Sequence, residues 1–270
     1  MKLVIEPGLA AAHYWRDLWR YRELMAFLAW RDVAVRYKQT AIGIAWALIR
    51  PALTLAVFVA FRRMVGATQG DVPEAILVLA AVLPWQFFST ALTETSASLV
   101  GNTSLISKVY FPRLIIPVAS VATAFVDFLI TLVMLAVLMA WYRVAPGLPL
   151  LALPLFILLA ALLSLGLGLL LGALTVTYRD FRYVVPFLVQ LGLFVSPVAF
   201  STSQVPERWR AVYGLNPLVG IIDGFRWSIL GGRTPLEPAW LLTSIALTAA
   251  SLVFGTWYFR RMERGFADVI

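Results

Sequence analysis

Six long runs of apolar residues, separated by short polar or basic connections, set the pattern of this chain. Each run is long enough, at about 1.5 Å per residue, to cross about 30 Å of hydrocarbon as a helix. The predicted spans are 41–61, 75–99, 114–142, 150–177, 183–202 and 238–259. The pattern predicts an all-α integral membrane protein with six transmembrane helices. Residues 1–40 are then a polar N-terminal segment, and residues 41–270 form the transmembrane domain.

The composition also favours the bilayer as the main solvent. Of the 270 residues, 61% are hydrophobic and 13% are charged, and the mean hydropathy is +0.86. A soluble domain of this size cannot bury so much apolar surface. The chain has no cysteine and a single histidine, His13, which excludes disulfides, thiolate sites and multi-histidine metal sites. We therefore expect no metal site and no catalytic residue.

The basic residues indicate how the chain is oriented. The net charge of +8 fits a membrane surface better than nucleic acid, because Lys and Arg cluster beside the apolar runs. Six spans place both termini on one side. Residues 1–40, 99–113, 178–182 and the C-terminus together hold 14 Lys and Arg, against 7 in the opposite connections. The positive-inside rule then predicts that both termini are cytoplasmic.

Three segments outside the spans differ from plain connections. Leu24–Lys38 mixes apolar and basic residues at helical spacing, which predicts an amphipathic helix in the cytoplasmic interface; a mere anchoring helix is the alternative. Residues 100–113 form a cytoplasmic excursion longer than a simple turn requires. Residues 206–230 hold two proline-started helices, the second with Asn216 as N-cap before Pro217. This second helix is too short to span, so the segment is predicted to be re-entrant beside a cavity.

Small residues recur within the fourth predicted span. Ser164, Gly168 and Gly172 are spaced by four, with Gly166 nearby, so they lie on one face of a helix. Small side chains allow another helix to approach closely. We interpret this stripe as a packing surface rather than a site of chemistry.

Two charges are predicted to lie deep in the membrane. Arg50 lies in the first span and Asp127 in the third, each about 15 Å from the cytoplasmic edge when counted along its helix. An unpaired charge at that depth is unfavourable, so we predict that the two face the protein interior and form an intramembrane ion pair. The alternative is that Arg50 reaches toward the interface alone and Asp127 binds a backbone group.

An aromatic cluster lies in the middle of the second span. Trp85, Phe87 and Phe88 are accompanied by Gln86 and the helix-distorting Pro84. Aromatic belts usually lie at the interfaces, so this position indicates a cavity wall. Aromatic faces suit the C–H faces of sugar rings, but they suit lipid and core packing equally well.

Motifs that are missing narrow the function. The lysines are Lys2, Lys38 and Lys108, and none follows glycine as a phosphate-binding P-loop requires. No serine-hydrolase elbow or zinc-protease motif occurs. Two classes remain: the membrane subunit of a machine powered by another chain, and a secondary transporter or intramembrane enzyme. The second class normally carries several ionisable groups within its spans.

The chain resembles type-2 ABC permeases that export polysaccharides, the membrane subunits of O-antigen, capsule and teichoic-acid transporters. The resemblance rests on RDVAVRYKQTAIGIAWALIRP (31–51), LPWQFFS (83–89), SLISKVYFPRLIIP (104–117), TYRDFRYVVPFLVQLGLFVSPVAF (177–200) and NPLVGIIDGFRWSILG (216–231). It runs in order from about Glu23 to the C-terminus and leaves residues 1–20 outside.

The resemblance implies partners and a cargo. Such permeases form homodimers, pair with two copies of a nucleotide-binding ATPase subunit, and pass a lipid-linked polysaccharide through the bacterial inner membrane. ATP and magnesium would bind the partner subunit, so this chain would hold no cofactor. The bilayer is its other partner, periplasmic export partners are an option, and nucleic acid has no role. A drug or lipid exporter of the same superfamily is the alternative, and a secondary transporter is a more distant one.

The resemblance also implies roles for groups of residues. The glycan channel would be lined by Tyr37, Trp85, Phe87 and Phe88. Coupling to the ATPase would involve Ser107, Lys108, Tyr110 and Arg113. The outer gate, within 206–230, would include Asn216, Pro217, Asp223, Phe225 and Trp227. Leu24–Lys38 resembles the gate helix at the glycan entrance.

Overall fold

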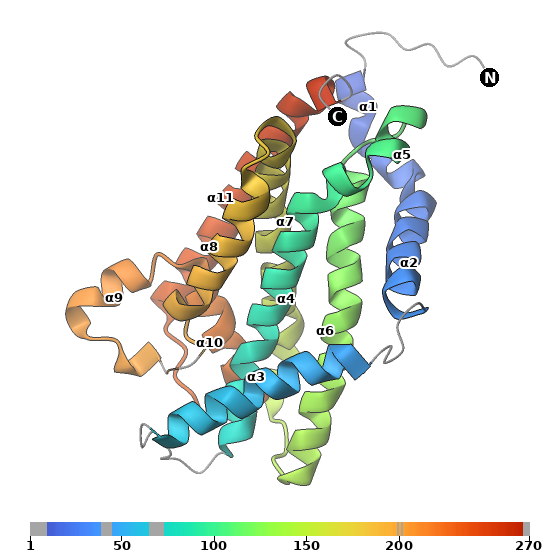
Figure 1. The fold of residues 1–270 in the computed structure, drawn as a ribbon. Helices are drawn as coiled ribbons and strands as arrows, with labels where there is room; N and C mark the ends of the chain where they lie inside the picture. Colours follow the sequence, from blue (N-terminus) through green and yellow to red (C-terminus); the bar gives the residue numbers. More distant parts are fainter. Residues whose placement is uncertain (1–9, 39–44, 65–72, 199, 201, 267–270) are drawn as a thin grey trace.

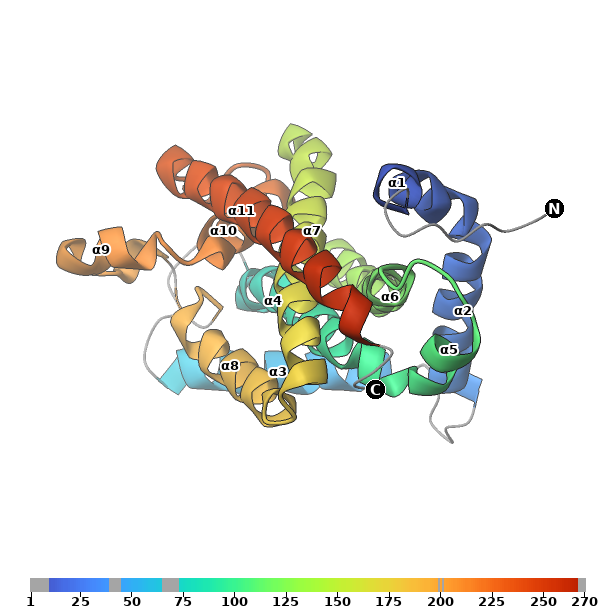
Figure 2. The same ribbon diagram turned by 90° about the horizontal axis from the view of Figure 1, so that it is seen from above.

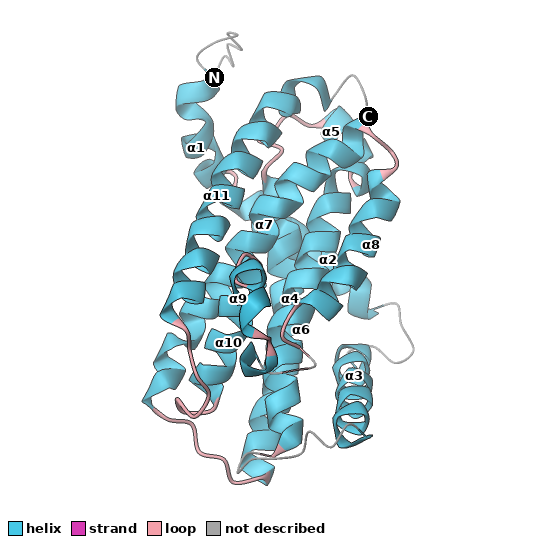
Figure 3. Cartoon of the chain, turned by 90° about the vertical axis from the view of Figure 1, so that its left-hand side faces the viewer, coloured by secondary structure: helices cyan, strands magenta, loops and turns pink. Residues whose placement is uncertain are grey.

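The computed structural model describes residues 10–38, 45–64, 73–198, 200 and 202–266, and every regular element in these ranges is a helix (Figure 3). The all-α prediction is confirmed. The α-helices are α1 (Ala10–Arg20), α2 (Arg22–Lys38), α3 (Ala45–Met64), α4 (Glu74–Gly101), α5 (Thr103–Lys108), α6 (Ile115–Trp141), α7 (Leu153–Thr177), α8 (Phe181–Val195), α9 (Glu207–Tyr213), α10 (Pro217–Ile229) and α11 (Pro238–Met262). Short 3-10 helices are η1 (Leu148–Ala152), η2 (Thr202–Gln204) and η3 (Glu263–Gly265).

Five helical segments of the described chain are long and apolar enough to cross a membrane, namely α3, α4, α6, η1 with α7, and α11. The sixth predicted span, 183–202, corresponds to the shorter apolar helix α8, which has 15 residues. α8 ends at Val195 because Pro197 disfavours helical geometry at Ser196, which is extended (φ −99°, ψ 154°). At about 1.5 Å per residue, α8 is roughly 22 Å long, which is less than the hydrocarbon thickness.

The central helix of the bundle is α4, with α3, α6, α7, α8 and α10 packed around it (Figure 2). Its candidate span is 72% buried, the largest share of the five. The consecutive residues Leu79, Ala80, Ala81, Val82 and Leu83 are each at most 1% exposed. Successive residues of a helix point in different directions, so every face of α4 is covered here. α4 is therefore the helix around which the others are arranged.

The stripe of small residues on α7 lies where that helix meets α4 and α11. Gly168 faces Thr95 of α4, and a Cβ added to Gly168 would lie 2.5 Å from its side chain. Gly166 faces α11, where a Cβ on Gly255 would lie 2.0 Å from the Gly166 carbonyl oxygen. Ser164 is fully buried. The predicted packing role of this stripe is confirmed.

Helix α3 runs across the long helices rather than beside them (Figure 1). It contacts α4 and α6, yet only 6% of its candidate span is buried. Leu53, Val57 and Phe61 are among its exposed apolar side chains. So large an apolar surface requires lipid or another protein surface to cover it.

The two ends of the described chain meet at one end of the bundle. α1, α5 and the last turns of α11 lie together there (Figure 1). The Tyr14 hydroxyl donates to the carboxylate of Glu263 at 3.3 Å, and the Arg260 guanidinium lies 4.4 Å from the centre of the Tyr14 ring. This arrangement is what an even number of crossings produces. That this end is cytoplasmic stays a prediction from the basic residues.

The chain between α8 and α11 forms two helices in different surroundings. α9 extends away from the bundle (Figures 1 and 2), whereas α10 packs against α4, α7 and α11 and buries nearly all of its residues. Pro206 immediately precedes α9, and Pro217 is the first residue of α10. The Asn216 side chain accepts the Leu218 N–H at 3.0 Å. The two predicted helix starts and the Asn216 cap are confirmed.

The close approach of α7 and α11 can be tested with one methyl group. Gly255→Ala should lower the free energy of unfolding by about 1–3 kcal/mol, because the added Cβ overlaps the backbone of Gly166. Gly101→Ala is the matched control, since a Cβ at Gly101 meets nothing within 4 Å. Thermal unfolding of both variants in detergent, followed by tryptophan fluorescence, makes the comparison. Equal midpoints would mean that the two helices do not meet at Gly255.

Candidate functional site

A cavity of about 480 Å³ opens between α2, α3, α4 and α6. Its polar and charged lining comprises Arg36, Tyr37, Arg50, Gln86, Thr90, Glu94, Asp127 and Thr131. Its apolar lining comprises Trp46, Ala47, Pro51, Leu83, Phe87, Ala124 and Phe128. The cavity thus combines aromatic faces with both signs of charge. Within the described residues, no group of three acidic or histidine side chains is placed to hold a metal ion.

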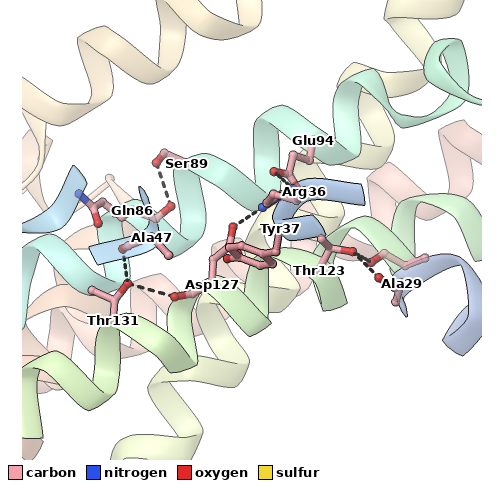
Figure 4. Close-up of polar contacts among 11 residues, drawn as sticks. Ala29, Arg36, Tyr37, Ala47, Gln86, Ser89, Glu94, Thr123, Asp127 and Thr131 are labelled. Atoms are coloured by element: carbon pink, nitrogen blue, oxygen red, sulfur yellow. Dashed lines mark hydrogen bonds and ion pairs between the residues drawn. The ribbon is translucent and has the colours of Figure 1, made fainter. Parts of the chain in front are cut away.

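Arg36, in the last turn of α2, connects two carboxylates on different helices (Figure 4). Its guanidinium donates to Glu94 of α4 at 2.5 Å and to Asp127 of α6. The three side chains are 24% to 31% exposed, so water screens them only in part. Burial alone would lower the pKa of Arg36, but the charges of Glu94 and Asp127 outweigh it and raise that pKa. Arg36 is therefore a permanent cation between two acids.

Tyr37 adds a second contact to the same carboxylate. Its hydroxyl donates to Asp127, alongside the Arg36 guanidinium. Burial is the main cause of a raised Tyr37 pKa, and the hydrogen bond to Asp127 raises it further. Tyr37 consequently stays a neutral donor. Two consecutive residues of α2 hold Asp127, which fixes the end of α2 against α6.

The predicted Arg50–Asp127 ion pair is wrong. Asp127 is paired with Arg36, and Arg50 forms no ion pair with any described residue, although it lines the same cavity. The prediction placed both charges by counting residues along parallel helices. α3 instead crosses α6 at a steep angle (Figure 1), so equal counts do not give equal positions. Arg50 is an exposed cation on the cavity wall.

Threonines on α6 make weaker polar contacts with α2 and α3 (Figure 4). Thr123 donates to the Ala29 carbonyl of α2 at 3.5 Å, and Thr131 donates to the Ala47 carbonyl of α3 at 3.5 Å. Both distances are at the limit for a hydrogen bond. The contacts of Arg36 and Tyr37 are therefore the stronger polar links between α2 and the helices around this cavity.

The predicted channel aromatics fall into two groups. Tyr37 and Phe87 line the cavity, and Phe87 packs on Phe128 with ring centres 5.1 Å apart. Trp85 and Phe88 do not line it. Trp85 is 5% exposed and packs on α8, where a Cβ at Gly192 would lie 2.8 Å from its ring. Trp85 and Phe88 do not border this cavity with Phe87, because residues one or two apart face different sides of a helix; their place in a glycan channel stays a prediction.

The predicted coupling segment presents a continuous exposed strip. Ser107, Lys108, Val109 and Tyr110 are all exposed, between the buried Ile106 and Phe111. Tyr110 is 67% exposed, although it is aromatic. A strip held at both ends by buried side chains is suited to contact with another protein.

Arg113 differs from the rest of that segment. Its backbone N–H donates to the Glu263 carboxylate at 2.9 Å, and its guanidinium donates to the Glu263 carbonyl. The guanidinium also lies 5.9 Å from the centre of the Phe266 ring. Arg113 is thus engaged by the C-terminal residues of its own chain. Of the four predicted coupling residues, the exposed strip contains three.

The predicted outer-gate residues form a structural core around α10. Phe225 is fully buried and its ring packs edge-on against Phe128. Asp223 accepts a hydrogen bond from Thr202 and lies 3.7 Å from Arg226. Asn216 and Pro217 begin the helix, and Trp227 is half-buried.

Arg226 also holds the loop that follows α8. Its guanidinium donates to the carbonyls of Val198 at 3.1 Å and Phe200 at 3.3 Å. Both carbonyls belong to the chain that follows α8, which ends at Val195. Arg226 was absent from the predicted set, although its spacing of three from Asp223 on a helix is a readable signal.

Other residues of the site were also missed. Arg36 is adjacent to the predicted Tyr37, and Glu94 lies on α4 beyond the predicted aromatic residues. Trp46 lines the cavity and has no conspicuous spacing in the sequence. Their common feature is the contact of α2 and α3 with α4 and α6, which sequence periodicity does not define.

Comparison with known proteins gives consistent similarities. The sequence model of the ABC-2 type transporter family matches residues 23–230. The chain is 28% identical over 246 residues to the O-antigen export system permease protein RfbA of Myxococcus xanthus, covering 88% of this chain and 94% of that protein. It is 25% identical to the RfbA protein of Klebsiella pneumoniae, covering 92% and 95%. It is also 25% identical to the polysialic acid transport protein KpsM of Escherichia coli, covering 75% and 79%.

The effect of Arg36 on stability can be distinguished from the effect of removing any other positive charge from the cavity. Arg36→Leu leaves two carboxylates without their cation and should lower the free energy of unfolding by about 1–3 kcal/mol. Adding Glu94→Gln and Asp127→Asn should restore part of the loss. Arg50→Leu, in the same cavity, should change it by less than about 0.5 kcal/mol. Thermal midpoints of the wild type, these three variants and Arg50→Leu with Asp127→Asn decide this. Rescue of Arg50→Leu by Asp127→Asn would contradict the assignment.

Proposed function

Because the chain belongs to the ABC-2 type transporter family, we propose that it is the membrane-spanning permease subunit of an ATP-driven exporter of lipid-linked polysaccharide. The observation that carries this proposal is the near full-length similarity to two O-antigen export permeases, which extends over 94% and 95% of those proteins. The similarity to a polysialic acid transport protein supports a polysaccharide cargo of the O-antigen or capsule type. The bacterial inner membrane is the matching location.

The proposed membrane arrangement has six crossings. α8 is the short crossing, and residues 206–230 are the re-entrant segment that accompanies it. The burial of α10 among α4, α7 and α11 supports this, because backbone within the membrane must be covered by protein. Both termini, α5 and the 1–40 segment lie on the cytoplasmic side.

The proposed path for the cargo begins at the cavity beside α2. Tyr37 on α2 and Trp46 on α3 line this cavity, and Phe87 with Phe128 forms an aromatic wall. Aromatic faces next to hydroxyl, amide and charged groups suit the mixed surface of a sugar. In this proposal α2 is the gate helix, held closed by the contacts of Arg36 and Tyr37 with Asp127. The α10 residues act as the outer gate, with Asp223 and Arg226 holding its closed form.

The proposed assembly contains two copies of this chain and two ATPase subunits. The exposed apolar surface of α3 supports contact with a second protein in the membrane, and another copy of this chain is the simplest candidate. ABC-2 permeases work with an ATPase that is a separate chain, so ATP and magnesium would be bound there. The exposed strip Ser107–Tyr110 is the proposed contact with that subunit.

Deletion of the gene in its host tests the proposal directly. Surface polysaccharide should disappear and lipid-linked glycan should accumulate in the cytoplasm, because synthesis continues while export stops. The wild-type chain should restore export, and an ATPase should co-purify with it. Unchanged surface glycan together with a lost resistance to drugs would contradict the polysaccharide cargo.

The coupling strip generates a narrower prediction. Lys108→Glu with Tyr110→Ala should reduce glycan export at least about tenfold while the amount of folded protein is unchanged, because both side chains are exposed. The same pair of changes at the other predicted cytoplasmic turn, Arg179→Glu with Tyr178→Ala, is the matched control. Export and folded protein are measured by surface-glycan blotting and gel filtration. Equal export by the two double variants would exclude this strip as the coupling surface.

A further inference from the structure

One carboxylate joins three parts of the chain that are far apart in sequence. Glu263, in η3, accepts the Arg113 backbone N–H at 2.9 Å and the Tyr14 hydroxyl at 3.3 Å on the same oxygen. Its backbone carbonyl accepts the Arg113 guanidinium. Glu263 thus binds α1, the connection between α5 and α6, and the end of α11 at one point. We define Tyr14, Arg113, Glu263 and Phe266 as the terminal clamp.

Apolar packing covers this contact. Phe266 is 1% exposed and meets the fully buried Phe259 edge-on, with ring centres 5.4 Å apart. The Arg113 guanidinium lies over the Phe266 ring. Burial raises the pKa of the Glu263 carboxyl, although the Arg113 N–H and the Tyr14 hydroxyl partly offset it. Hydrogen bonds to this partly buried carboxyl are harder to replace by water than those on an open surface.

The clamp holds the base of the exposed strip and leaves the strip free. Arg113 lies three residues after Tyr110 and two before the start of α6 at Ile115. Phe111 and Leu114, on either side, are buried. A displacement of Ser107–Tyr110 is therefore transmitted to α6 through the backbone and to α11 through Glu263.

Two of the clamp's three parts lie outside residues 23–230, the range that the family model matches. The family match covers residues 23–230, so it includes Arg113 but neither Tyr14 nor Glu263. Tyr14 and Glu263 thus connect the segments on either side of that range to the segment next to the strip. A connection of this kind is unnecessary for a loop that only links two spans.

We propose that Glu263 is a positioning residue for energy coupling: through the terminal clamp it fixes the strip Ser107–Tyr110 so that movement of the ATPase is passed to α6 and α11 together. This inference rests on the proposed function, since it presumes that the strip contacts an ATPase. Glu263 acts through Arg113 and does not itself touch the partner or the cargo.

The first measurement uses the permease alone. Hydrogen exchange of residues 103–114 in detergent should be at least about tenfold faster in Glu263→Ala than in the wild type, because the Arg113 N–H loses its acceptor. Tyr14→Phe, which removes only a hydroxyl, should give a smaller rise. Glu263→Gln keeps an acceptor oxygen and should restore most of the protection. Glu207→Ala, on α9, is the control and should leave this segment unchanged.

The second measurement uses the complex with its ATPase in membrane vesicles. Glycan exported per ATP hydrolysed should fall at least about threefold in Glu263→Ala while hydrolysis continues. Glu263→Gln and Glu207→Ala should stay near the wild-type ratio. Faster exchange with an unchanged ratio would show a structural role only and would overturn the proposal. Unchanged exchange would overturn the clamp itself.

The proposed permease function and the proposed role of Glu263 can be refuted separately. If the wild-type chain captures no ATPase, the proposed function is wrong and the coupling role falls with it, while the exchange data still decide whether Glu263 holds this segment. If Glu263→Ala does not fold, Tyr14→Phe and Glu263→Gln carry both measurements. Equal export ratios and equal exchange in Tyr14→Phe and the wild type would then refute the proposal.

Discussion

Two carboxylates on neighbouring helices face the same guanidinium, and the shape of the cavity depends on that contact. Glu94 and Asp127 would repel each other across the gap between α4 and α6 if no cation lay between them. Arg36 supplies that cation from α2. Together with the Tyr37 hydroxyl on Asp127 and the apolar packing of Leu28, this charge cluster holds α2 against the bundle. The same contacts therefore hold in place the side of the cavity that α2 forms.

A second constraint acts at the other end of the bundle, where α8 stops early. Backbone carbonyls released by a broken helix need donors, and lipid provides none. Asn216 donates to the Val195 carbonyl at 3.4 Å, and Arg226 donates to the carbonyls of Val198 and Phe200. α10 and its N-cap residue Asn216 therefore supply donors to the last residue of α8 and to the chain that follows it. Its burial and its polar residues have the same cause.

The sequence was informative wherever a local pattern decides the structure. Apolar runs indicated the long helices, Asn216–Pro217 marked a helix start, and the stripe Ser164–Gly172 marked a close helix contact. It was uninformative wherever the outcome depends on how one helix is rotated or tilted against another. Asp127 found Arg36 rather than Arg50 because α3 lies crosswise. Trp85 and Phe88 turned away from the cavity because only one face of α4 borders it.

The contact between Gly166 and Gly255 joins α7 and α11 rigidly at one point. With the Gly255 Cα against the Gly166 carbonyl, no side chain separates the two backbones at this contact, so a shift of one helix there displaces the other. Any widening of the bundle has to pivot elsewhere. α3, the least buried of the candidate spans, offers far less resistance to such a movement. The stiffness of the molecule is thus distributed unevenly, with a rigid contact between α7 and α11 and a more compliant α3.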